Sequence, residues 1–306
     1  MKKIMKVIGV ICLIVLLLIA AGVGFLYYVV YHAPMVPKEY WNKVKTEADI
    51  ESYYLGYGNY QISYINEKAE KPVNKYVIYY PEELNQDKYP VVVIVNGTGV
   101  FANKEKPLFE HLASWGFIVI GNYDGSTWSG QSADLTLDYL LKLNEDKNSI
   151  FYQKIDTGNI GITGHSQGGV GVFNEIQNNT HSDLYKCAVS ISPTEEEMAK
   201  LLQIPYDASK TTIPIMLLAG TENDVISIKN LEKMYKTINS DKVMAIKSGQ
   251  SHGEMLYSAD GYVTAWFMWH LQNDTNAAKA FVGSNAEILN NPIYQNQNCQ
   301  IVETYQ

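Results

Sequence analysis

The sequence contains no arginine, and all 24 of its basic residues are lysines. Arginine supplies the bidentate contacts with which proteins bind phosphate groups and read guanine edges. Beyond the N-terminus the lysines form no dense stripe, and the net charge is −8. The composition therefore argues against a nucleic-acid partner.

Cysteine is also scarce, with three in 306 residues. Cys12 lies in an apolar N-terminal run, so Cys187 and Cys299 form the one possible pair. Cys187 begins an apolar, strand-like segment, where a lone cysteine is usually a small buried hydrophobe. A bridge to Cys299 stays open as the alternative. Neither the cysteines nor the six histidines show metal-ligand spacing, so we predict no metal and no other cofactor.

Charge is absent from residues 7–31, a run of about 25 residues that follows Lys2, Lys3 and Lys6. A bilayer-spanning helix takes about 20 residues, whereas the apolar part of a signal peptide takes about 7–15. We therefore predict a transmembrane signal anchor, with the lysines cytoplasmic and the catalytic domain extracellular. The alternative is a cleaved signal peptide, with a poor cleavage candidate at Ala20-Ala21-Gly22 and a secreted product.

The remainder reads as one globular α/β domain, because 46% of the residues are hydrophobic and 18% are charged. Eight apolar, strand-like segments alternate with helix-like ones, and such alternation predicts a mostly parallel sheet of about eight strands flanked by helices. The expected strands are 61–65, 75–80, 91–95, 117–120, 159–163, 187–191, 213–219 and 242–247. The expected helices are 106–115, 131–145, 167–177, 227–238 and 254–272.

The expected organisation has four parts. Residues 1–31 hold the cytoplasmic lysines and the anchor, and residues 32–52 form a stalk. Residues 53–284 form the catalytic domain. Residues 285–306, rich in asparagine and glutamine, form a loosely ordered polar tail.

A G-x-S-x-G motif, Gly164-His165-Ser166-Gln167-Gly168, lies between an expected strand and an expected helix. This setting is typical of a nucleophile elbow, in which small residues allow a turn sharp enough to expose the serine hydroxyl. The motif by itself also arises by chance. It makes Ser166 the candidate nucleophile and the N–H of Gln167 a candidate oxyanion donor.

An acid and a histidine follow Ser166 in the order found in α/β-hydrolases. Asp224 comes after the strand 213–219, with Glu222 as the nearby rival for the acid, and His252 comes after the strand 242–247. Each loop lies at the C-terminal end of its strand, so we expect the three side chains to meet at one sheet edge. They predict a Ser166–His252–Asp224 triad acting through an acyl-enzyme.

The other histidines receive structural roles. His165 is assigned to packing, because its side chain must leave the elbow in another direction. The histidines without an evident partner are expected to be structural or solvated: His111, His181 and His270. The loop Asn96-Gly97-Thr98-Gly99 follows the most apolar strand and should supply the second oxyanion donor through Thr98.

Several of these segments resemble the bacterial cutinase and polyester-hydrolase family. The elbow is similar to that family's GHSMGG, and the segment 220–224 to its GAEND acid loop. Similarity extends to Tyr76-Val77-Ile78-Tyr79-Tyr80-Pro81, to Ser251-His252 and to the final helices, so it spans about residues 58–282. The resemblance implies the α/β-hydrolase fold and an open, lidless esterase acting on small-molecule or lipid-like esters, polyesters included. Thr98 and Thr194 stand where the family carries aromatic residues.

We therefore predict a membrane-tethered extracellular carboxylic-ester hydrolase for a short- or medium-chain ester. Two alternatives remain. The same triad would serve a serine peptidase or an acyltransferase. A non-catalytic surface-binding protein on a hydrolase scaffold is the second alternative, and the 23 tyrosines would supply its binding surface.

Overall fold

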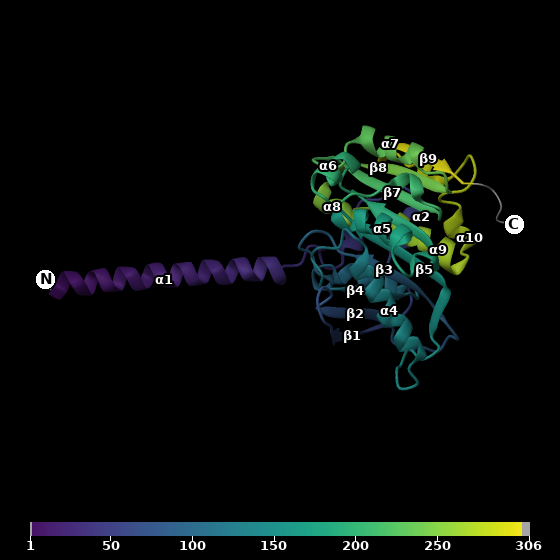
Figure 1. Cartoon of the computed structure of the whole chain (residues 1–306). Helices are drawn as coiled ribbons and strands as arrows, with labels where there is room; N and C mark the ends of the chain where they lie inside the picture. Colours follow the sequence, from purple (N-terminus) through teal and green to yellow (C-terminus); the bar gives the residue numbers. More distant parts are fainter. Residues whose placement is uncertain (1, 302–306) are drawn as a thin grey trace.

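The computed structural model describes residues 2–301 of the chain, but not the side chains of residues 2–12 and 30. Its centre is a nine-stranded sheet of order β1-β2-β4-β3-β5-β6-β7-β8-β9 (Figure 1). The six strands from β4 to β8 in this order pair in parallel, and β1, β2 and β9 pair antiparallel at the two edges. The prediction of a mostly parallel α/β sheet flanked by helices is confirmed.

Each of the eight expected strands is present. The strands are β1 (Ile62–Lys68), β2 (Lys75–Pro81), β3 (Tyr89–Val95), β4 (Ile118–Asn122), β5 (Ile155–His165), β6 (Tyr185–Ile191), β7 (Ile215–Glu222), β8 (Lys242–Ser251) and β9 (Tyr294–Gln300). The helices are α1 (Lys2–Tyr31), α2 (Asp49–Leu55), α3 (Lys106–Ser114), α4 (Gln131–Glu145), α5 (Gln167–Asn178), α6 (Glu196–Leu201), α7 (Ile228–Thr237), α8 (His252–Ser258), α9 (Asp260–Gln272), α10 (Thr275–Ala278) and α11 (Glu287–Asn290).

The strand β3 shows why the sheet is covered on both faces. All seven of its residues are buried, as expected for a central parallel strand. Val91, Val93 and Val95 belong to the core beneath α4, α5 and α7. Val92 and Ile94 belong to the core beneath α3, α8 and α9. The alternation of side chains along a strand thus divides one apolar run between two cores.

The single helix expected over 254–272 is two helices, α8 and α9, which meet at Ala259. The helix α8 begins two residues early, at His252, because Ser251 and Glu254 form a capping box at its start. Asp260 lies in the first turn of α9, where a negative charge is favourable, and its carboxylate is 2.7 Å from Nδ1 of the buried His111. The catalytic histidine candidate is therefore placed at a fixed helix start.

The polar tail is more ordered than expected. Residues 287–290 form α11, and residues 294–300 form β9, which pairs antiparallel with β8. An edge strand obtains its stability largely from backbone hydrogen bonds, so asparagine and glutamine side chains can face solvent along it. Only Tyr294 is buried in this strand. The tail thereby adds a ninth strand to the eight expected, while residues 302–306 lie outside the described part of the chain.

The cysteines do not form the alternative bridge. Cys187 and Cys299 are both free thiols. Cys187 lies on β6 and Cys299 on β9, so two strands separate them in the sheet.

The segment expected to be a stalk, residues 32–52, packs on the domain. Val36 and Tyr40 are fully buried against Leu55, Leu108 and Leu256. The helix α2, which begins within this segment, lies along α9. Apolar side chains in a segment that reads as polar overall account for the difference. The boundary expected between residues 52 and 53 is therefore not a break in packing.

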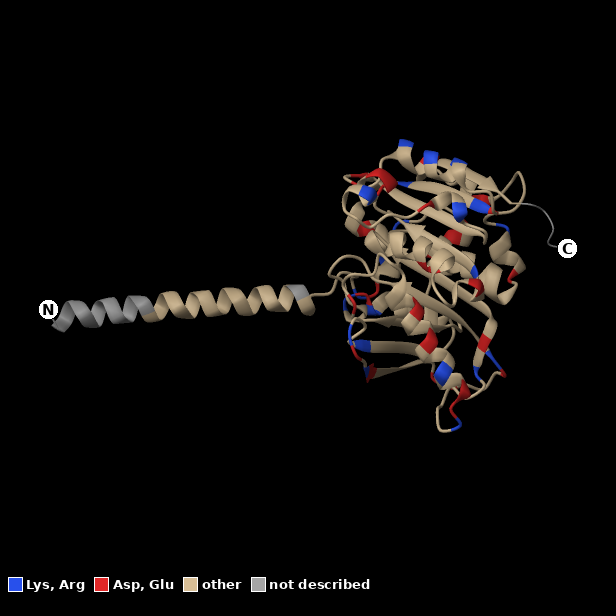
Figure 2. Ribbon diagram, in the orientation of Figure 1, with Lys and Arg blue, Asp and Glu red and all other residues tan. Residues whose placement is uncertain are grey.

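The helix α1 projects from the domain (Figure 1). Charges of both signs are spread over the domain, and the part of α1 whose side chains are described carries none (Figure 2). Within the portion of the chain whose side chains are described, no helix combines the length and apolar character needed to cross a bilayer. The predicted anchor lies partly outside that portion, as do the three lysines before it, and it stays a prediction.

Candidate active site

Ser166 occupies the sharp turn between β5 and α5. Its backbone has φ 60° and ψ −122°, a combination that costs a residue with a side chain about 1–3 kcal/mol and persists only where the surroundings enforce it. The Ser166 N–H donates to the Ile191 carbonyl oxygen at 2.9 Å. The strained backbone angles thus occur at the candidate nucleophile itself, as expected for a nucleophile elbow.

The glycines on either side of Ser166 are required by close backbone contacts. A Cβ atom at Gly164 would lie 2.4 Å from the Gly168 oxygen. A Cβ atom at Gly168 would lie 2.1 Å from the Val95 oxygen. Real Cβ contacts are essentially never this short, so the G-x-S-x-G spacing follows from the way β3, β5 and α5 pack.

The structure brings the three candidate triad residues together at the C-terminal edge of the sheet. The His252 Nε2 atom is 3.0 Å from Ser166 Oγ, and its Nδ1 atom is 3.0 Å from Asp224 Oδ1. Asp224 is 2% exposed and His252 is 25% exposed. An acid sealed from water thus orients a histidine that solvent and substrate can reach, which is the arrangement that a serine nucleophile needs.

Asp224 is held by more donors than the sequence indicated. Its Oδ2 atom accepts hydrogen bonds from Ser192 Oγ at 2.6 Å and from the Gly220 N–H at 2.7 Å. Burial by itself would raise the pKa of Asp224, but the hydrogen bonds from His252, Ser192 and Gly220 outweigh burial and lower it. The carboxylate therefore stays ionised and able to stabilise a protonated His252.

His165, which we expected only to pack, contacts the catalytic histidine candidate. Its Nε2 atom lies 2.7 Å from the His252 carbonyl oxygen, and the two rings are 4.4 Å apart. Burial, followed by the proximity of His252, lowers the pKa of His165 to about 4. A neutral His165 donating to that carbonyl fixes the start of α8. No signal in the sequence distinguishes this role from packing.

The expected oxyanion loop lies beside the nucleophile. A Cβ atom at Gly97 would be 3.4 Å from the His165 oxygen and 3.8 Å from Ser166 Cβ. Thr98 is exposed in the same loop, and Gln167 is the first residue of α5, where a backbone N–H has no partner within the helix. The Gln167 side chain has a separate use, because its Oε1 atom accepts the Thr127 N–H at 2.9 Å. The loop of Thr98 and the start of α5 thus both adjoin Ser166, and the role of their N–H groups as oxyanion donors stays a prediction.

The other candidates have different surroundings. Glu222, the rival acid, is exposed and contacts the Thr221 hydroxyl. His111 pairs with Asp260, and His181 lies 2.8 Å from Asp134. His270 is buried in α9, and burial lowers its pKa to about 3. Across the described residues, no group of three or more histidine, cysteine or acidic side chains is arranged to hold a metal ion.

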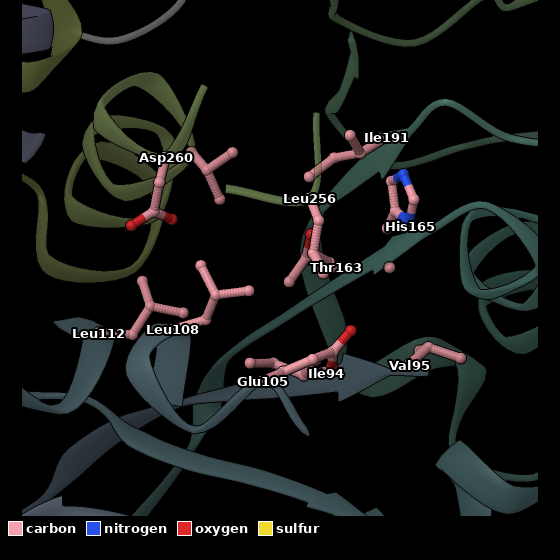
Figure 3. Close-up of a pocket in the computed structure, with 12 residues that line it drawn as sticks. Ile94, Val95, Glu105, Leu108, Leu112, Thr163, His165, Ile191, Leu256 and Asp260 are labelled. Atoms are coloured by element: carbon pink, nitrogen blue, oxygen red, sulfur yellow. The ribbon is translucent and has the colours of Figure 1, made fainter. Parts of the chain in front are cut away.

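A small cavity lies behind the elbow (Figure 3). Its volume is about 30 Å³, enough for one or two water molecules. Glu105, Thr163 and Asp260 surround it, with His165 at one side. Burial raises the pKa of Glu105 to about 8. This space is too small for an ester, so substrate must bind on the outer side of Ser166.

Comparison with known proteins agrees with the geometry. A family profile described as PET hydrolase-like matches residues 57–300. A cutinase, "Cutinase est2" of Thermobifida alba, is 28% identical over 210 residues. That match covers 65% of this chain and 64% of the cutinase, so the chain spans slightly less than two thirds of that relative.

Proposed function

Because the chain belongs to the PET hydrolase-like family, we propose that it is a serine carboxylic-ester hydrolase that works through an acyl-enzyme. The observation that carries the proposal is the continuous hydrogen-bonded series from Asp224 through His252 to Ser166. The relative named a cutinase supports the same reaction class.

In the first half of the reaction, His252 Nε2 takes the proton of Ser166 as its Oγ attacks the ester carbonyl carbon. The resulting oxyanion accepts hydrogen bonds from the N–H groups of Thr98 and Gln167. Fixed backbone dipoles stabilise this charge without having to reorganise. The carbon–oxygen bond to the alcohol then breaks, and His252 returns the proton to the departing alcohol.

In the second half, water replaces the alcohol. The water oxygen attacks the acyl carbon while His252 takes a proton from that water. The Ser166–acyl bond breaks, Ser166 regains its proton from His252, and the carboxylic acid leaves. Asp224 stays ionised throughout and stabilises the protonated His252.

The substrate we propose is a small or lipid-like ester with a short or medium chain. Thr98 and Thr194 stand where the family carries aromatic residues, so a flat aromatic polymer would lack those two stacking partners. We also propose that residues 7–31 tether the domain to the membrane with the catalytic domain outside the cell. The apolar run and the lysines before it support this placement.

Hydrolysis of p-nitrophenyl esters from acetate to palmitate tests the function, with Ser166→Ala as the paired variant. We expect activity in the wild type and a loss of at least about 10³-fold in the variant. Ser209→Ala, an exposed serine far along the chain, is the matched control and should retain activity. A folded wild-type protein that cleaves no ester would overturn the proposal and favour a peptidase, an acyltransferase or a binding role.

A further inference from the structure

A groove of about 510 Å³ lies where α1 meets the domain. This volume is within the range of small-molecule sites, about 300–1,000 Å³. Its aromatic lining comes from two parts of the chain that are far apart in sequence. Tyr27 and Tyr31 come from the end of α1, and Phe101 and Tyr123 come from the loops after β3 and β4.

The four rings form a continuous row. The ring centroids of Tyr27 and Tyr31 are 4.7 Å apart. Tyr31 stacks on Phe101 at 5.5 Å with 3° between the ring planes, and Phe101 lies 5.8 Å from Tyr123. Tyr31 remains 43% exposed, so the row offers aromatic surface to a ligand as well as to itself.

Two loop glycines, Gly97 and Gly99, lie between Ser166 and Gly125, which lines the groove. Gly97 is adjacent to Ser166, and the Gly99 N–H donates to the Gly125 oxygen at 3.0 Å. A Cβ atom at Gly125 would lie 3.4 Å from the Phe101 ring. A Cβ atom at Gly99 would meet no atom within 4 Å. The loop segment 97–99, with the exposed Thr98 between its two glycines, thus lies between the groove and Ser166, and the space above Gly99 is open.

The chemistry of the lining favours an uncharged apolar ligand. Besides the rings, the lining contains His32, Asn74, Ser126 and the buried Asp124, whose carboxylate would repel a phosphate or a free fatty acid. No lysine is among the lining residues, and the nearby Lys75 lies over the Tyr123 ring with Nζ 4.8 Å from the ring centroid. Aromatic faces bury hydrocarbon without requiring hydrogen bonds. The groove therefore suits the part of an ester that is not reacting.

We propose that this groove binds the hydrocarbon chain of the ester substrate, so that the end of α1 forms part of the substrate site. This inference rests on the proposed esterase function and adds a determinant of chain-length preference. Each CH₂ group buried in the groove improves binding roughly fourfold. The ester carbonyl lies at Ser166, and the chain crosses the glycines to reach Phe101 and Tyr31.

The experiment uses the full-length chain in lipid nanodiscs and compares the wild type with two single variants, Phe101→Ala and Tyr31→Ala. Tyr28→Ala is the matched control, because Tyr28 lies on the same helix and is exposed but does not line the groove. The measured quantity is the ratio of kcat/KM for p-nitrophenyl octanoate to that for the acetate. A second series, octyl acetate against ethyl acetate, tests whether the chain belongs to the alcohol instead of the acyl group.

We expect the octanoate-to-acetate ratio, or the octyl-to-ethyl ratio, to fall about tenfold in both groove variants. In the groove variants, hydrolysis of the short ester should stay within about twofold of wild type, because its chain is too short to reach the groove. In Tyr28→Ala, both ratios should also stay within about twofold of wild type. Unchanged ratios in both series would overturn the inference while leaving the esterase intact. An equal loss on short and long esters would also overturn it, because that pattern indicates general damage to the site.

A binding measurement separates this inference from the proposed function. Octyl acetate is titrated into Ser166→Ala by calorimetry, where no hydrolysis is required. Phe101→Ala in that background should weaken binding about tenfold. Equal binding with and without the Phe101 ring would reject the groove even if the wild type cleaved no ester.

Discussion

Asp224 and Glu51 are both carboxylates whose side chains are no more than 2% exposed, and both accept several hydrogen bonds. Around Asp224, the donors include His252, which is itself 25% exposed and reaches Ser166. Around Glu51, the donors are Lys247 Nζ at 2.9 Å, the Tyr294 hydroxyl at 2.6 Å and Asn291 Nδ2 at 2.8 Å. Lys247, Tyr294 and Asn291 are all buried.

The difference between these two sites lies in their donors. Burial lowers the pKa of Lys247, while the charge of Glu51 and its hydrogen bond act in the opposite direction. A lysine sealed between α2, β8 and the C-terminal segment can hold the fold together but cannot exchange protons with a ligand. His252 has one nitrogen on a buried acid and the other on an accessible serine. A buried carboxylate can therefore contribute to catalysis only when one of its hydrogen-bond partners is accessible to a ligand.

Substitution of Asp224 should cause the greatest loss of activity, and this loss would distinguish it from Glu51. Asp224→Asn should lower kcat by about 10⁴-fold, because an amide no longer stabilises the required tautomer or the protonated form of His252. Glu222→Gln, two residues away and exposed, is the control and should retain activity. Ester hydrolysis and thermal unfolding measured on both proteins test this. A mild loss in Asp224→Asn would show that another group orients His252.

A substitution beside Glu51 should affect stability instead of activity. Lys247→Met should destabilise the protein by about 3–5 kcal/mol, because Glu51 would be left as a buried charge without its counter-ion. The folded fraction should keep its kcat. Denaturant unfolding compared with the exposed Lys229→Met measures the effect. A large fall in kcat at unchanged stability would contradict the division between the two regions.

Glu105 extends the comparison to a buried carboxylate with few donors. Its Oε2 atom has no hydrogen-bond partner among the described residues, and burial raises its pKa from 4.5 to about 8. Between these values the unfolded chain has lost the proton that the folded protein keeps. The contribution of Glu105 to stability is therefore full below pH 4.5 and is lost as the pH rises toward about 8.

Glu105→Gln should remove this pH dependence, because an amide resembles the protonated acid. The difference in unfolding free energy between about pH 5 and about pH 8 should shrink by on the order of 3 kcal/mol. Glu110→Gln, partly exposed on the helix α3 that follows Glu105, is the control. If Glu105→Gln kept the wild-type difference, Glu105 would be ionised in the folded protein.

The smallest expected effect concerns the donors to Asp224. Ser192→Ala removes one hydrogen bond and should lower kcat about tenfold, because a hydrogen bond to a charged group contributes about 1.5–3 kcal/mol. It should also raise the pKa of Asp224, so the acidic limb of the pH–kcat profile should move to higher pH. Ser248→Ala, exposed on β8 four residues before His252, is the control. A fall in kcat without movement of that limb would indicate a packing defect instead.

Much of the fold follows from patterns within short segments. Each of the eight strands has a counterpart in an apolar run, and the predicted helix 131–145 has the observed bounds. The differences arise where a partner far along the chain intervenes. The stalk packs because Tyr40 donates to Asp260, 220 residues away, and the tail pairs because β8 offers it an edge.

Sequence patterns suffice to predict the elbow, the order of serine, acid and histidine, and the sheet edge where they meet. Each of these is set by contiguous residues or by the direction of parallel strands. Tertiary packing, by contrast, is what brings Ser192 and Gly220 to Asp224, places His165 against the His252 carbonyl oxygen, and adds tyrosines of α1 to a groove on the domain. These contacts join residues whose proximity depends on how helices and loops pack, and no local pattern records that packing.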